Sequence, residues 1–249
     1  MLDILQILRD FGLLLLVGQY PSGPLGGLAI TFLLSIFGIL LAFPLGGALA
    51  LARISTYGFF YWPATALVYV MRGLPLIMVI FWVYFFLPAV LGRPVSGFST
   101  MLATLVIYQA AYLAEIVRAG IQSLPKGQME AARAVGLTYM QAMHKVIYPQ
   151  ALYNMVPSML SQFVSTIKET SLGYVISVNE LTFAANQINS SLLSKPFEVF
   201  AILAGIYFVL SFSLTHLTRR LEQRIAQRRA GKISPPGALV TTATPATTE

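Results

Sequence analysis

The stretch Leu28–Ala52 reads LAITFLLSIFGILLAFPLGGALALA, and no charged residue interrupts it. A helix needs about 20 mostly apolar residues to cross the hydrocarbon layer of a membrane. Four further apolar stretches are candidates on the same grounds: Leu74–Leu91, Phe98–Ala119, Leu152–Val178 and Phe197–Leu217. The sequence therefore predicts an all-α, integral membrane protein with five spans.

The candidate span Leu74–Leu91 is the last part of a longer apolar stretch, Ala64–Leu91, which contains the sequence Arg72-Gly73-Leu74-Pro75. At about 1.5 Å per residue, the whole stretch is too long for one straight span. Because proline breaks a helix, we expect a break at this sequence that separates the true span from a shorter piece before it.

The composition excludes several classes of protein. Of the 249 residues, 57% are hydrophobic and only 10% are charged, whereas soluble domains carry roughly 25% charged residues. A disordered chain would show the opposite balance. The chain has no cysteine and two histidines, so disulfides, thiolate nucleophiles and Cys-ligated or multi-histidine metal sites are excluded. No metal site is predicted.

The positions of the Lys and Arg residues predict the orientation, because cytoplasmic loops carry an excess of them. With an external N-terminus, only Arg9, Arg93 and Lys195 fall outside, and most of the remainder fall in cytoplasmic segments. We therefore expect an external or interfacial segment without a cleaved signal peptide (1–26), a membrane domain (27–220) and a cytoplasmic tail (221–249). The tail is expected to be basic, then disordered, and to contact anionic lipid headgroups rather than nucleic acid.

The loop between the third and fourth predicted spans is long, and its core (121–150) should hold an ordered element. From Gly120 it reads GIQSLPKGQMEAARAVGLTYMQAMHKVIYPQ. We expect one short helix at Met129–Val135, a turn at Gly136 and a second short helix at Tyr139–Val146. Pro149 is expected to close the stretch. Two short helices across a glycine turn would form a compact cytoplasmic projection.

Within this loop, five residues have the spacing of a known motif: Glu130, Ala131, Ala132, Gly136 and Pro149. They resemble the EAA loop of ABC importer permeases, E-A-A-x3-G-x9-I-x-L-P, with Val146 and Tyr148 in place of the usual isoleucine and leucine. Both replacements are apolar, so the helix face is kept. The resemblance implies that this segment is the coupling helix, which docks in a groove of the ATPase subunit.

Other blocks resemble the type I permeases of polar amino acid importers, and the similarity extends over roughly residues 25–225. These blocks are Tyr69–Leu76, Ala111–Ile121, Pro125–Gln128 and Lys168–Leu172. The last resembles their K-D-T-S-L box, with Glu169 in place of aspartate. The segment Arg72–Val79, followed by Trp82, Tyr84 and Pro88, looks most like glutamate/aspartate-type permeases. Glutamine and basic amino acids are the alternative substrates.

The resemblance also implies partners. The chain has no G-x-x-x-x-G-K-[ST] motif, so it does not bind ATP through a phosphate loop of its own. A separate ATPase dimer would hydrolyse ATP with Mg²⁺, next to a second permease subunit that is the same chain or a paralogue. A periplasmic amino acid-binding protein would deliver the substrate. The chain would be a transporter subunit of the bacterial inner membrane, not an enzyme.

A few polar residues lie within the predicted spans, where charges are costly and face partners or a pathway. The candidates for a substrate pathway or gate are Lys168, Glu169, Thr170, Ser171, Arg72, Gln109 and Glu115. Lys168 or Glu169 has an alternative role as a structural pair with Arg72, Asn179 or Glu180. Glu115 is expected to pair with Arg118 in helix packing. Arg72 either extends to lipid headgroups or forms an inner-gate ion pair.

Two functions of other classes compete with an importer subunit. A secondary transporter or channel that works alone would predict inverted internal repeats, and we find no convincing copy of one half in the other. A membrane enzyme would require a cluster of catalytic residues at the bilayer, for which Lys168 and Glu169 are the only candidates.

Overall fold

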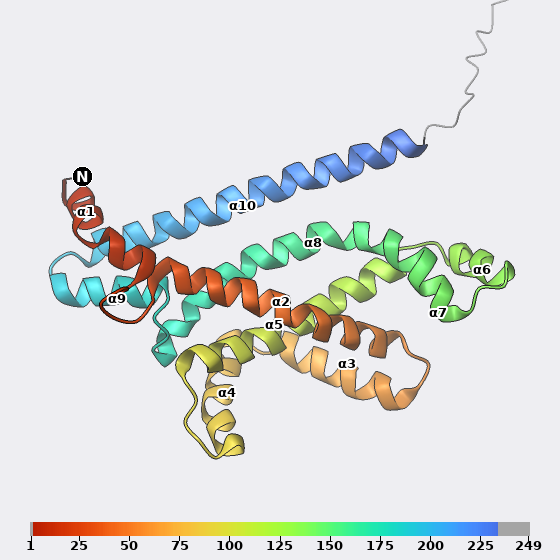
Figure 1. Ribbon diagram of the computed structural model, residues 1–249, viewed down its shortest axis with the longest axis horizontal. Helices are drawn as coiled ribbons and strands as arrows, with labels where there is room; N and C mark the ends of the chain where they lie inside the picture. The colour runs from red at the N-terminus through yellow and green to blue at the C-terminus, as the bar shows by residue number, and fades with distance from the viewer. Residues whose placement is uncertain (1, 234–249) are drawn as a thin grey trace, which may run out of the picture.

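The computed structural model describes residues 2–233, and the part of the predicted disordered tail beyond them lies outside the described residues. The described chain is mostly helical and contains no named strand, only two isolated β-bridges. Four long helices run along the long axis of the molecule (Figure 1): α2 (Gly27–Ile54), α5 (Gly97–Gln122), α8 (Tyr148–Glu169) and α10 (Pro196–Ile233). The all-α membrane fold is confirmed.

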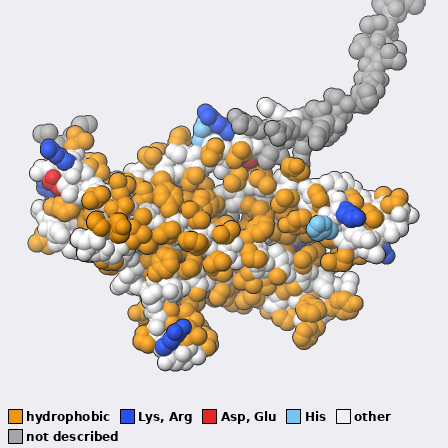
Figure 2. All heavy atoms as spheres, viewed as in Figure 1, with side chains coloured by type: hydrophobic (Ala, Val, Ile, Leu, Met, Phe, Trp, Pro, Cys, Tyr) orange, Lys and Arg blue, Asp and Glu red, His pale blue; other side chains and the backbone are white. Residues whose placement is uncertain are grey.

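By length and composition, three of the described helices can cross a membrane: α2, α5 and the part of α10 from Pro196 to Gln223. The helices α3 (Gly58–Gly73) and α4 (Leu76–Leu91) are together long and apolar enough for a fourth span, but the chain bends by 114° at the break between them. They count as a fourth span only if the bent pair is one broken span. The break between them is where the Gly/Pro sequence predicts it. On one face of the molecule, hydrophobic side chains cover the middle, and Lys and Arg lie at the margins (Figure 2).

The predicted count of five spans is not confirmed, because the fourth apolar stretch is not a single helix. The helix α8 ends at Glu169, and a 3-10 helix, η2 (Thr170–Ile176), follows it. A separate helix, α9 (Leu181–Leu192), comes next. The helix α8 also carries many amide and hydroxyl side chains along its length, which lower its mean hydropathy below that of α2 and α5.

The centre of the fold is the packing of α2 against α5. Small residues recur every four positions on the buried face of α2: Gly38, Ala42, Gly46 and Ala50. Such residues allow two helix backbones to approach closely. A Cβ atom on Gly38 would lie 3.3 Å from the Cβ of Leu105, so α5 occupies the space that a side chain would need. The small residues of α2 therefore serve packing within this chain.

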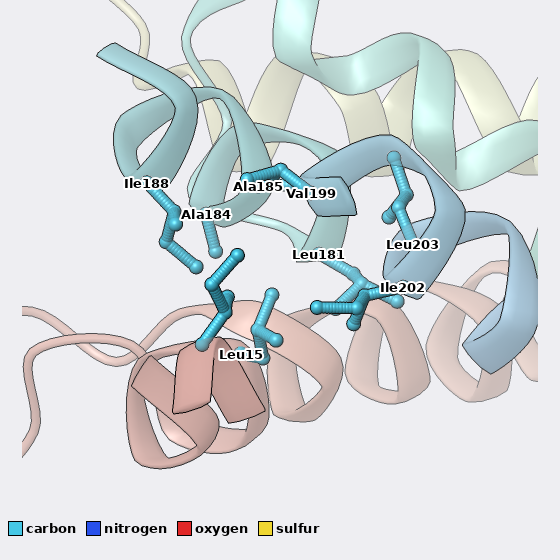
Figure 3. Close-up of a cluster of buried hydrophobic side chains, with 9 residues drawn as sticks. Leu15, Leu181, Ala184, Ala185, Ile188, Val199, Ile202 and Leu203 are labelled. Atoms are coloured by element: carbon cyan, nitrogen blue, oxygen red, sulfur yellow. The ribbon is translucent and has the colours of Figure 1, made fainter. Parts of the chain in front are cut away.

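The N-terminal helix α1 (Leu2–Val17) packs against α2, α9 and α10. Its residues Ile7 and Leu15 are buried with side chains of α9 and α10, among them Leu181 and Ile202 (Figure 3). The external or interfacial placement of residues 1–26 stays a prediction, as do the proposed boundaries of the membrane domain.

The predicted projection contains two short helices across a glycine turn. The first is α6 (Lys126–Ala134), and Gly136 follows with a φ of +89°, which residues with a side chain rarely adopt. The second is α7 (Tyr139–Ala142). Thr138 caps it in a capping box with Gln141, in which each side chain bonds the other residue's backbone N–H.

The expectation that Pro149 closes this stretch is wrong. A π-helical turn, η1 (Met143–Ile147), follows α7 and continues directly into α8, so the helix does not stop at Val146. Pro149 lies in the first turn of α8, where its missing N–H is tolerated. The wider π-helical turn lets the N–H of Tyr148 bond the carbonyl of Met143. The second half of the projection and α8 are therefore one continuous helical segment.

Candidate functional site

A partly buried polar network joins α5 to α8. The side chain of Gln109 is fully buried on α5, and its amide nitrogen donates a hydrogen bond to the Glu169 carboxylate. The amide nitrogen of Gln162 on α8 donates to the Gln109 carbonyl oxygen at 2.7 Å. Because a carboxylate that is largely shielded from water requires such partners, these three side chains form a defined polar site between α5 and α8.

The structure does not bring the other three residues of the predicted box into this network. Lys168 is exposed, next to the partly buried Glu169. The hydroxyl of Thr170 donates to the carbonyl of Ile167 at 2.7 Å, and that of Ser171 donates to the carbonyl of Lys168 at 2.6 Å. Both hydroxyls therefore close the turn in which α8 becomes η2.

The sequence also allows Glu169 a structural role, as one half of a pair that holds helices together, but its partner in the structure is not one of those expected. The sequence suggests Arg72, Asn179 or Glu180, and the structure places Gln109 beside Glu169 instead. Glu180 forms its own buried site at the start of α9. It accepts hydrogen bonds from the backbone N–H groups of Thr182 and Phe183, both at 2.8 Å. Glu180 is thus the N-cap of α9.

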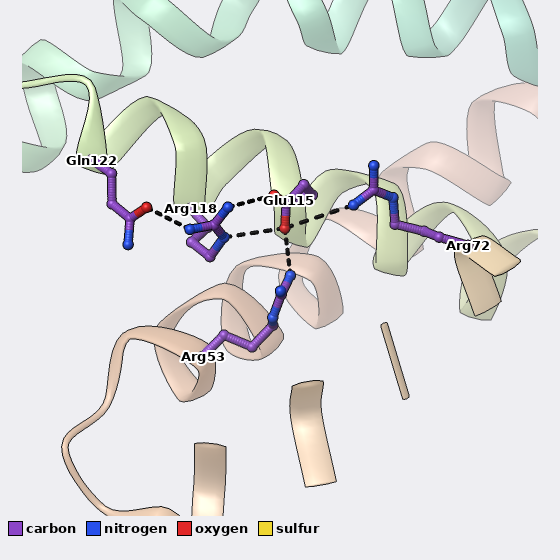
Figure 4. Close-up of polar contacts among 5 residues, drawn as sticks. All are labelled: Arg53, Arg72, Glu115, Arg118 and Gln122. Atoms are coloured by element: carbon purple, nitrogen blue, oxygen red, sulfur yellow. Dashed lines mark hydrogen bonds and ion pairs between the residues drawn. The ribbon is translucent and has the colours of Figure 1, made fainter. Parts of the chain in front are cut away.

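The expected pair of Glu115 with Arg118 is present, within a larger cluster (Figure 4). Arg118 donates from Nη2 to Glu115 Oε1 at 2.5 Å and from Nε to Oε2 at 3.1 Å. Arg53 of α2 donates from Nη1 to Glu115 Oε2 at 2.5 Å. Arg72 of α3 lies farther away, with 3.8 Å between its Nη1 and Glu115 Oε2.

The sequence does not predict that Arg53 belongs to this cluster. By sequence, Arg53 is only one of the basic residues assigned to cytoplasmic segments. Its side chain is 7% exposed, and its guanidinium lies over the ring of Tyr69 at 5.5 Å. Arg72 lies over the ring of Tyr112, also at 5.5 Å. An arginine beside a long apolar stretch is a weak signal of burial, so nothing in the sequence separates Arg53 from the other basic residues.

Four of the five residues predicted to couple to an ATPase lie in α6 and the turn after it, and the fifth, Pro149, lies in the first turn of α8. Glu130 and Ala131 are exposed, whereas Ala132 is buried against the rest of the segment. Three large apolar side chains also face outward: Val135 (79% exposed), Tyr139 (48%) and Met140 (70%). An exposed apolar patch with a polar rim is typical of a surface that binds another protein. The projection thus has the character of a docking surface.

Comparisons with known proteins give relatives over most of the chain. A family model described as "Binding-protein-dependent transport system inner membrane component" matches residues 36–227. The probable glutamine ABC transporter permease protein GlnM of Bacillus subtilis is 39% identical over 195 residues, which cover 78% of this chain and 89% of that protein. The glutamate/aspartate import permease protein GltK of Escherichia coli is 36% identical over 215 residues, covering 83% and 96%. The arginine transport system permease protein ArtQ of Bacillus subtilis is 34% identical over 201 residues, covering 81% and 91%.

A solved structure is similar as well. The crystal structure of an amino acid ABC transporter with histidines contains a chain that matches at 32% identity and a TM-score of 0.78. The match covers 90% of this chain and 99% of that chain.

Proposed function

Since the chain belongs to the family of binding-protein-dependent transport system inner membrane components, we propose that it forms the path by which glutamate and aspartate cross the bacterial inner membrane. It is a permease of an ABC amino-acid importer and not an enzyme. The family implies a separate ATPase and a substrate-binding protein. The proposal adds the substrate, the path, the orientation and the mode of coupling.

The observation that carries the path is the partly buried network of Gln109, Gln162 and Glu169. These side chains lie between α5 and α8 and present amide and carboxylate groups there. A carboxylate can hold the ammonium group that all amino acids share, and an amide can accept from or donate to either end. The network is therefore the part of the path that receives the substrate backbone.

We propose that the projection couples the path to the ATPase. The docking surface for the ATPase comprises the exposed apolar side chains Val135, Tyr139 and Met140, together with the exposed Glu130. The π-helical turn then transmits a displacement of α7 to α8, because the helix is continuous from α7 through η1. The importer contains two permease subunits, since two ATPase subunits require two such surfaces. The N-terminus lies outside and the C-terminus in the cytoplasm, as the Lys/Arg distribution favours.

The substrate is the part of the proposal that similarity supports least, because the relatives carry names for glutamine, glutamate/aspartate and arginine transport. We favour acidic amino acids because the segment 72–79 resembles permeases of that type. In the reconstituted complex with its binding protein, glutamate and aspartate are expected to stimulate ATP hydrolysis at least threefold. Glutamine and arginine are the comparison substrates. A response to arginine alone would refute this choice.

Replacing Glu169 with glutamine is expected to lower the maximal uptake rate at least tenfold when the binding protein is saturated. A hydrogen bond to a charged group contributes about 1.5–3 kcal/mol, and about 1.4 kcal/mol corresponds to tenfold in rate. Initial rates of labelled amino acid uptake into proteoliposomes measure the effect.

Two matched variants accompany this measurement. Glu169→Asp keeps the charge, and aspartate is the residue usual in the resembling box, so this variant should retain a third or more of the rate. Glu198→Gln removes a carboxylate from the first turn of α10, a helix that contributes no residue to the network, and should leave the rate unchanged. If Glu169→Gln transports as fast as the unmodified complex, Glu169 has no part in the path.

A further inference from the structure

The cluster around Glu115 joins three helices through one carboxylate (Figure 4). Arg53 comes from the last turn of α2, Arg72 from the last turn of α3, and Arg118 from α5 itself. Each guanidinium lies within 4 Å of a Glu115 oxygen. The Glu115 side chain is only 24% exposed. Glu115 is therefore the common counter-ion of three separate structural elements.

The formal charges in this cluster do not balance. Three guanidinium groups surround a single carboxylate, so the cluster is positive overall. Like charges at such distances repel strongly where water is partly excluded. Without the Glu115 carboxylate, the three guanidinium groups would keep only uncharged partners among the described residues: the Gln122 amide and the rings of Tyr69 and Tyr112. The arrangement therefore depends more on Glu115 than on any one arginine.

The three arginines hold Glu115 unequally. Arg53 and Arg118 each approach to 2.5 Å, whereas Arg72 stays at 3.8 Å. The Arg72 side chain is 40% exposed and also contacts the face of Tyr112. Arg72 directly precedes the break at which α4 turns by 114° away from α3. The weakest contact thus lies at the bend.

The helix that carries Glu115 leads straight into the projection. Only the residues 123–125 separate α5 from α6. The backbone N–H of Ser123 still bonds the carbonyl of Ala119, and the Ser123 hydroxyl accepts a hydrogen bond from Asn154 of α8 at 2.8 Å. A displacement of the projection therefore reaches α5 within a few residues of Glu115.

We propose that Glu115 is a positioning residue that latches the bend between α3 and α4 onto α5. Arg53 and Arg118 fix its carboxylate. The ion pair between Arg72 and Glu115 breaks and forms again as the projection moves. This inference rests on the proposed function, because a latch of this kind acts only in a transport cycle. It concerns how ATP hydrolysis is coupled to movement of the helices, not which amino acid is carried.

The test measures uptake per ATP hydrolysed in proteoliposomes that contain the whole complex. Arg72→Gln should raise hydrolysis in the absence of loaded binding protein at least threefold and lower uptake per ATP at least fivefold. Glu115→Gln should change both quantities in the same directions and by at least as much. Glu115→Asp should retain at least a third of the uptake per ATP of the unmodified complex. Arg93→Gln alters an exposed arginine in the loop after α4 and should change neither quantity.

A purely structural role would lower uptake and hydrolysis together and leave their ratio unchanged, and that result would overturn the latch. If Glu115→Gln does not assemble, Arg72→Gln decides, because the half-exposed Arg72 side chain can be replaced without opening the interior. Coupling equal to that of the unmodified complex would then refute the proposal. The assay uses whichever amino acid stimulates the unmodified complex, so an error in the proposed substrate does not affect it.

Discussion

Replacing Gly46 with valine is expected to prevent the chain from assembling into a stable complex. A Cβ atom at Gly46 would lie 2.8 Å from the Cβ of Leu113 and 3.0 Å from the carbonyl oxygen of Ala110. Both neighbours belong to α5, and one of the contacts is with backbone, which cannot rotate away. Overpacking costs typically about 1–3 kcal/mol, or more when the backbone must shift. Size-exclusion chromatography of the solubilised complex should show loss of most of the assembled fraction.

Gly47 is the matched control, because it neighbours Gly46 on the same helix. No atom lies within 4 Å of a Cβ built at this position. Gly47→Val should therefore yield the assembled complex in near-normal amounts, and its thermal midpoint should stay within a few degrees. If the two valine variants assemble equally well, α2 does not pack closely enough on α5 to exclude a side chain.

Local sequence patterns predict the features that depend on a few neighbouring residues. The apolar stretch 28–52 forms α2, and the Gly/Pro sequence after Arg72 forms the break between α3 and α4. Gly136 adopts a positive φ between two short helices. In each case the signal is local, because it rests on hydropathy, on the missing N–H of proline or on the conformational freedom of glycine.

The contacts between distant residues could not be predicted in this way. Gln109 and Glu169 are 60 positions apart, and Arg53 and Glu115 are 62 apart. No periodicity specifies which polar residues of two spans will meet. The sequence also does not predict that α8 ends at Glu169. The apolar pattern continues through η2, although the α-helix does not. Tertiary packing decides these features.

Replacing Gly136 with valine is expected to lower uptake at least tenfold and to reduce the amount of ATPase subunit that co-purifies with the chain. Gly136 has a φ of +89°, a conformation in which a β-branched residue is strained. No atom lies within 4 Å of a Cβ built there, so the effect comes from the backbone alone. The turn opens to relieve the strain, and α6 and α7 no longer keep their relative placement.

Gly127→Val separates this backbone effect from the mere addition of a side chain. Gly127 lies near the start of α6, and a Cβ atom there would also meet nothing within 4 Å, but its φ is not positive. Its valine variant should therefore bind the ATPase and transport at close to the normal rate. Equal losses in both variants would mean that any bulk on α6 blocks docking, and equal activity would mean that the turn does not position the docking surface. Only a loss confined to Gly136→Val supports coupling through the geometry of this turn.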